Sequence, residues 1–259
     1  MEKRKLSMWR NIGIVVDAMH ENRRLFFLTL FAAALLFRLP ALFNDYYDVD
    51  VLTTLVATKE YLLGAVPGVD FKENKRFLYH LLFKGSYLLC PEYGWSMVHF
   101  FTAVIIYLTS IFIYLTGSLV SGRRIGILAA FLYAILISSF NRHFMASNGE
   151  VIYNLPLAAG LYFFCLFLKN LNLKGGFYLA SALVCSYLAF SIKFQGLMLL
   201  IFLIVFMLVY MPYYYKGLRF TLMLGAGAVV LLLLDWFFAG IVVRPVLDAT
   251  GIIGKLSYS

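Results

Sequence analysis

The sequence predicts an all-α integral membrane protein with about seven transmembrane helices and two juxtamembrane helices in a long loop after the first span. The 259 residues are 63% hydrophobic and only 14% charged, with a mean hydropathy of +0.85. A soluble domain of this length could not cover so much apolar surface. Apolar runs approaching the roughly 20 residues of a membrane span recur along the chain. Lys and Arg gather in alternate connections, which is typical of cytoplasmic loops.

The chain divides into three predicted parts. Residues 1–24 are polar and basic, and they predict a cytoplasmic amphipathic helix on the membrane surface rather than a signal peptide. Residues 25–241 form the transmembrane module, and residues 242–259 form an extracytoplasmic tail. The predicted spans are 25–43, 95–120, 126–140, 151–168, 177–191, 197–212 and 221–241.

Charge fixes the predicted orientation. The connections at 121–124, 169–176 and 213–220 contain Lys and Arg but no acid, and we expect them in the cytoplasm. The basic cytoplasmic loops therefore explain the net charge of +9, and no nucleic-acid partner is expected. Most acids fall on the opposite side. Acids contribute little to the positive-inside rule, so this second asymmetry indicates a functional site on the outer face.

The loop at residues 44–94 is too long for a simple connection, and loops of this length are usually functional or carry structure of their own. Apolar residues recur at helical spacing in 51–63 and in 77–89. We therefore expect two short helices lying on the membrane surface.

Charged residues gather where the first span leaves the membrane. Arg38 lies at the edge of the apolar run, where a cation is costly and normally has a partner. Asp45, Asp48 and Asp50 follow within six residues. An extended chain would aim Asp48 and Asp50 the same way, and paired carboxylates beside a cation suit general-base catalysis or a divalent metal. A solvated loop start is the alternative interpretation.

The same segment resembles a known family. Asp50, the run Ala57-Thr-Lys-Glu60, the turn at 64–71 and the pair Asn74-Lys75 resemble the first extracytoplasmic loop of GT-C glycosyltransferases, which include protein O-mannosyltransferases and the aminoarabinose transferase of lipid A. In this resemblance Asp50 falls on the catalytic aspartate. The chain has Val51 where many relatives have glutamate.

Two further segments resemble the outer helix ends of this family. The segment 141–156 includes Glu150, where the family carries an acid, and 191–196 includes Lys193, which the resemblance places on the donor phosphate. The alternatives are that Glu150 is a helix N-terminal acid favoured by the dipole and that Lys193 reaches towards lipid headgroups.

The resemblance implies a GT-C-like fold and a polyprenyl-phosphate sugar donor in the plasma (inner) membrane of a prokaryote. The sugar would pass to an extracytoplasmic acceptor, which could be a lipid, a glycan or a protein. Asp50 would be the general base, with Asp48 and Glu150 as further catalytic candidates. The expected phosphate ligands are Arg38, Lys75, Arg142 and Lys193.

Other candidates are weaker. His80, His143 and the intramembrane Asp235 are retained as site candidates, although stray histidines are more often structural. No cofactor is identified, and a divalent metal is left open. Two alternative functions also stay open: a non-catalytic GT-C-like subunit that works with another membrane subunit, and a transporter of lipid-linked sugars.

Overall fold

The computed structural model describes residues 13–43, 48–63, 77–138, 146–170, 173–214 and Gly227. Every regular element within these ranges is helical, which confirms the predicted all-α class. The predicted seventh span at 221–241 and the tail at 242–259 lie outside the described residues, apart from Gly227.

A short helix at residues 13–21 precedes the main elements. The helices that follow are α2 (Arg23–Phe43), α3 (Val49–Leu62), α4 (Phe77–Leu89), α5 (Gly94–Ser121), α6 (Arg123–Ile137), α8 (Gly149–Ile152), α9 (Asn154–Lys169), α10 (Leu173–Ile192), the 3-10 turn η1 (Phe194–Gly196) and α11 (Leu197–Tyr214). The predicted helix at 77–89 ends at Leu89 as predicted, and the other helices that the structure describes agree with their predicted bounds within a few residues.

Four helical segments are long and apolar enough to cross a membrane: Arg23–Phe43, Gly94–Ser121, Gly149–Lys169 and Lys174–Ile192. A shorter apolar stretch covers Phe194–Val209. Helix α6 has 15 residues, or about 22 Å at the rise of an α-helix, and is shorter than the hydrocarbon core. The structure therefore supports a multi-pass membrane protein, and the count of seven spans stays a prediction.

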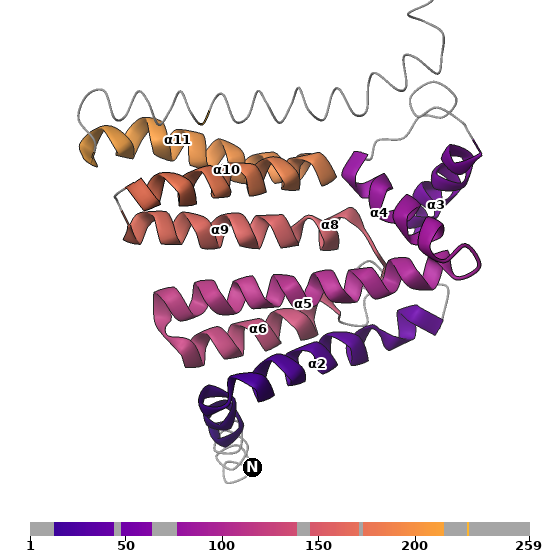
Figure 1. Ribbon diagram of the computed structural model, residues 1–259, viewed down its shortest axis with the longest axis horizontal. Coiled ribbons are helices and arrows are strands. Elements are labelled where there is room, and N and C mark those ends of the chain that lie inside the picture. Colours follow the sequence, from indigo (N-terminus) through magenta and orange to yellow (C-terminus); the bar gives the residue numbers. More distant parts are fainter. Residues whose placement is uncertain are drawn as a thin grey trace, which may run out of the picture.

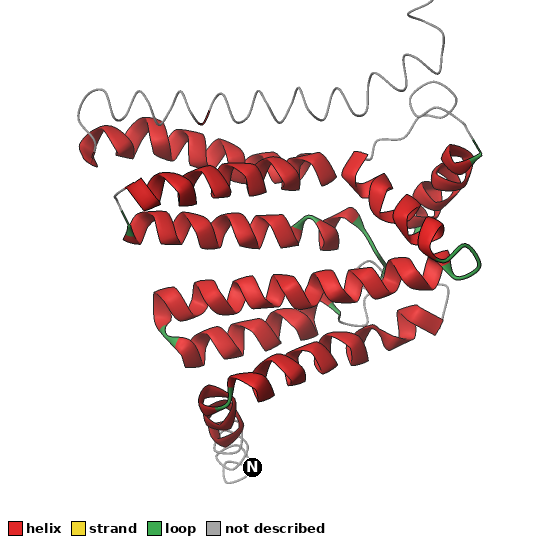
Figure 2. Ribbon diagram, in the orientation of Figure 1, coloured by secondary structure: helices red, strands yellow, loops and turns green. Residues whose placement is uncertain are grey.

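The long helices run roughly alongside one another and alternate in direction (Figure 1). Helices α3 and α4 lie at one end, together with the turn from α10 to α11, and we call this the loop end. The opposite end contains the connections α5–α6 and α9–α10, and we call it the basic end. Figure 2 shows how short the α5–α6 connection is. The basic end includes Arg123, Arg124, Lys169 and Lys174.

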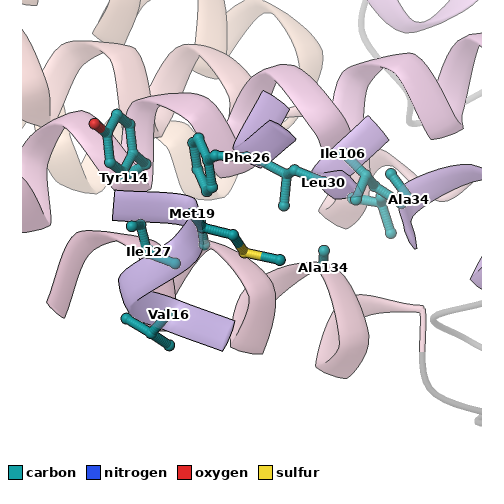
Figure 3. Close-up of a cluster of buried hydrophobic side chains, with 11 residues drawn as sticks. Val16, Met19, Phe26, Leu30, Ala34, Ile106, Tyr114, Ile127 and Ala134 are labelled. Atoms are coloured by element: carbon teal, nitrogen blue, oxygen red, sulfur yellow. The ribbon is translucent and has the colours of Figure 1, made fainter. Parts of the chain in front are cut away.

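The first apolar core joins the N-terminal helix to the bundle (Figure 3). Val16 and Met19 of that helix are buried in a cluster with side chains of α2, α5 and α6, such as Phe26. Ile14 and Val15 are 60% and 52% exposed. The helix therefore has one apolar face on the protein and another available to the membrane interface. Residues 1–12 of the predicted amphipathic segment lie outside the described ranges.

Helices α5 and α6 pack closely around a single connecting residue. Gly122 has φ +94°, a conformation that glycine adopts without steric cost. A Cβ atom added at Gly117 would lie 2.9 Å from the Cα atom of Gly126. One added at Gly126 would lie 2.8 Å from the backbone nitrogen of Ser118. The absence of side chains at these two positions lets the two backbones approach.

We predict that Gly126→Ala destabilises the bundle, because the new methyl group meets the α5 backbone and forces the helices apart. Overpacking of this kind costs about 1–3 kcal/mol. Gly85→Ala on α4 is the matched control, since a Cβ atom there meets nothing within 4 Å. Thermal unfolding in detergent is expected to show a lower Tm for Gly126→Ala only. An equal Tm for both variants would contradict the close packing of α5 and α6.

Candidate functional site

An apolar cluster at the loop end includes sequence neighbours of three candidate residues. Its buried members come from α3, α4, α5, α8, α10 and the segment before α8; they are Val51, Tyr79, Phe83, Val98, Ala146, Ile152 and Ile192. Val51 directly follows Asp50, and Ile192 directly precedes Lys193. Ile152 lies two residues after Glu150. Packing of these apolar neighbours therefore brings the three charged residues to the same end of the bundle.

Asp48 and Asp50 have different environments. The Asp48 side chain is buried, and its Oδ1 atom accepts a hydrogen bond of 2.9 Å from the backbone N–H of Asp50. The Asp48 carbonyl accepts from the backbone N–H groups of Val51 and Leu52. Asp48 is therefore the N-cap of α3. Asp50 lies in the first helical turn and is exposed. The expectation of two carboxylates aligned on an extended chain is wrong, because the helix begins before Asp50.

Arg38 is fully buried in α2. Its Nη2 atom donates to the backbone carbonyl of Ala146, at 3.5 Å. The sequence predicted a partner for this intramembrane cation, and the carbonyl of Ala146 is one such partner. Because Ala146 precedes the short helix α8 by three residues, Arg38 contacts the segment that leads directly to Glu150. The predicted phosphate-binding role of Arg38 stays a prediction.

A buried polar network fixes the segment before α8. The Tyr79 hydroxyl donates to the carbonyl of Ser147 at 2.9 Å. The Ser147 hydroxyl lies 2.8 Å from the Thr102 hydroxyl and 2.9 Å from Nδ1 of His99. All four side chains are fully buried. These contacts join α4 and α5 to a short stretch of non-helical backbone, and they give the carbonyl and the hydroxyl of Ser147 partners inside the protein.

Sequence reasoning missed His99, Thr102 and Ser147. His99 and Thr102 are three residues apart on the apolar helix α5, and a histidine within a span is a signal of function or of a partner. Thr109 continues the same face two turns later and is also buried. This spacing could have identified a polar stripe. It could not have identified Ser147 as the partner, 45 residues away.

Glu150 and Lys193 form an ion pair between the start of α8 and the turn after α10. The Glu150 side chain is 48% exposed, whereas Lys193 is only 16% exposed. Gly149 lies beside the aliphatic part of Lys193, since a Cβ atom there would be 3.4 Å from its Cδ atom. The two residues were predicted separately, one as a catalytic candidate and one as a phosphate ligand. The structure brings them together.

Of the remaining predicted residues, the structure describes only His80. His80 is half-buried on α4, with its ring 6.2 Å from that of Tyr79. Lys75, Arg142, His143 and Asp235 lie outside the described residues, as does Asp45. Among the residues that the structure does describe, no three His, Cys, Asp or Glu side chains gather as a metal site requires. A divalent metal therefore stays an open prediction.

We predict that Asp48 stabilises the start of α3 through its capping oxygen. Replacement by Ala removes the cap and is expected to destabilise α3 by about 1 kcal/mol, whereas Asn keeps a capping oxygen without the charge. Hydrogen exchange at the backbone amides of Asp50 to Leu52 would measure the difference. We expect faster exchange in Asp48→Ala and near-native exchange in Asp48→Asn. Equally fast exchange in both would show that the negative charge, rather than the cap, holds the helix start.

Comparison with known proteins adds no relative: no protein-family model, no curated protein and no solved structure matches this chain.

Proposed function

We propose that the loop end is the active site of a membrane glycosyltransferase that moves a sugar from a polyprenyl-phosphate donor to an acceptor hydroxyl. The observation that carries this proposal is the shared apolar cluster beneath Asp50, Glu150 and Lys193. It joins an exposed carboxylate to a cation at one end of a membrane bundle. A charged donor phosphate stays at such an interface while its hydrocarbon tail remains in lipid.

The chemistry assigns one role to each charge. Asp50 accepts the proton of the acceptor hydroxyl as that oxygen attacks the anomeric carbon. The bond between the anomeric carbon and the phosphate oxygen breaks, and the lipid phosphate leaves with the electron pair. Lys193 stabilises the negative charge that develops on this phosphate. Arg38 supports the same region through its hydrogen bond to the carbonyl of Ala146, in the segment before α8. Lys75 and Arg142 are further proposed phosphate ligands.

The proposed orientation follows from charge. The basic end, with Arg123, Arg124, Lys169 and Lys174, faces the cytoplasm, and the loop end faces away from it. Seven spans in a GT-C-like arrangement would then place the N-terminus inside and the active site outside. The proposed membrane is the plasma membrane of a prokaryote, and the acceptor is an extracytoplasmic lipid, glycan or protein.

The ion pair of Glu150 and Lys193 favours one alternative function. A lysine that leaves an internal carboxylate for a phosphate can bind and release a lipid-linked sugar without any catalytic acid. A transporter of such lipids would use the same loop end. It would not require the Asp50 carboxylate for chemistry, and this difference separates the two functions experimentally. A non-catalytic subunit that completes its site with another chain would show transfer only in the assembled complex.

We predict that Asp50→Asn lowers sugar transfer by about 100-fold or more, the usual contribution of a general base. Glu60→Gln is the matched control, because Glu60 is exposed on the same helix and loses the same charge. The assay uses a radiolabelled polyprenyl-phosphate sugar in membranes containing the full chain. Retained transfer in Asp50→Asn would exclude this base. If the unmutated chain transfers no sugar, alone or with partner subunits, but moves the donor lipid across vesicles, the transporter is correct.

A second prediction concerns donor affinity. If Lys193 exchanges Glu150 for phosphate, Glu150→Gln removes the competitor and tightens donor binding, whereas Lys193→Gln weakens it. Each change in donor affinity is expected to be about three- to tenfold. A hydrogen bond to a charged group contributes about 1.5–3 kcal/mol, and the hydrogen bonds to water that the binding groups give up offset part of this. Equilibrium binding of the labelled donor measures both. Weaker binding in both variants would mean that the pair acts only as a structural link.

A further inference from the structure

The His99 imidazole is held inside the bundle by a polar contact on one side of its ring. The side chain is fully buried on α5, and its Nδ1 atom lies 2.9 Å from the Ser147 hydroxyl. The Nε2 atom is also buried, and it has no hydrogen-bond partner within the part of the chain that the structure describes. A neutral imidazole carries its proton on one of the two nitrogens. The neighbours of Nδ1 therefore decide which nitrogen carries it.

The Thr102 hydroxyl sets the direction of the hydrogen bonds around Ser147. It has a single proton, but it lies 2.8 Å from the carbonyl of Val98 and 2.8 Å from the Ser147 hydroxyl. A carbonyl can only accept, so the contact with Val98 requires the Thr102 proton. The contact with Ser147 then requires the Ser147 proton, because two hydroxyl oxygens at this distance repel each other unless a proton lies between them.

The Ser147 proton is therefore not available to His99. At their contact Ser147 accepts, and the donor is an N–H group at Nδ1 of His99. The opposite tautomer would leave one of the three contacts without a proton. It would also carry an Nε2–H that has no acceptor among the described residues, and a buried donor without a partner is costly. A doubly protonated ring would add a charge inside the bundle.

We propose that His99, with its proton on Nδ1, is a positioning residue for the loop end. By donating to Ser147 it orients a side chain three residues before Glu150, in the non-helical segment that leads into α8. The consequence for sugar transfer rests on the proposed function, because that function gives Glu150 its role. The position of the proton does not depend on any activity.

The first test is the tautomer, measured by ¹⁵N NMR of the full chain with labelled histidine in lipid bilayers. The signals lost in His99→Asn identify this ring. We expect a protonated Nδ1 and an unprotonated Nε2. In Thr102→Val the Ser147 proton becomes available to Nδ1, so either tautomer makes one hydrogen bond and we expect the Nε2–H form to appear. Thr109→Val is the matched control, because Thr109 is buried on the same helix and donates to the carbonyl of Ile105.

The tautomer of the unmutated chain decides the proposal even if Thr102→Val does not fold. A proton on Nε2 there, alone or together with one on Nδ1, would overturn it. The same conclusion would follow if the Nε2–H form appeared in neither threonine variant or equally in both.

The second test is hydrogen exchange at the backbone N–H groups of Val151 and Ile152, which bond the carbonyl of Asn148 directly after Ser147. His99→Leu is expected to speed this exchange about fivefold, the effect of losing about one hydrogen bond. His99→Asn keeps an amide donor near the place of Nδ1 and is expected to restore slow exchange. Unchanged exchange in the Leu variant, or equally fast exchange in both, would refute the positioning role. A chain that transfers no sugar would contradict the proposed function and leave both tests unaffected.

Discussion

The structure depends on keeping a short piece of non-helical backbone hydrogen-bonded inside a bundle of apolar helices. The residues from Ala146 to Asn148 precede α8 and are buried. Unsatisfied backbone groups are costly in a membrane protein, where irregular backbone is tolerated only when the protein itself provides partners. Tyr79 binds one carbonyl here and Arg38 another. The hydroxyl of Ser147 meets α5. Three helices, α2, α4 and α5, therefore converge on three residues.

This convergence also sets the position of the loop end. Helix α4 carries Tyr79 and packs on α5 and α3, so fixing the segment before α8 also fixes part of the long loop after α2. Glu150 follows directly, and its ion pair with Lys193 ties α8 to the end of α10. A polar network in the interior thus supports an ion pair at the surface. The contacts of Tyr79 and Arg38 with this segment restrict its position, and with it the position of Glu150.

The sequence predicted the helices well, because long apolar runs leave few alternatives to a helix in a membrane. The end of the helix Phe77–Leu89 was predicted to the residue from its periodicity. The start of α3 was not, since the cap formed by Asp48 moves the helix start two residues earlier than the apolar pattern suggested. That small difference changed the environment of both aspartates. Local hydrogen bonding, rather than periodicity, decides where a helix begins.

The candidate site was predictable only as separate residues. Glu150 and Lys193 were each identified from their local segments, but a contact across 43 residues depends on how α8 and α10 pack. The capping bond of Asp48 is made to the backbone N–H of Asp50. A capped first turn holds the Asp50 backbone fixed, while Thr53 and Thr54 donate to its carbonyl. The exposed Asp50 carboxylate is therefore attached to the capped first turn of a helix that packs into the same apolar cluster as Ile192. The proposed role of Asp50 as a general base would gain from this fixed position, because little ordering is left to be done when a substrate arrives.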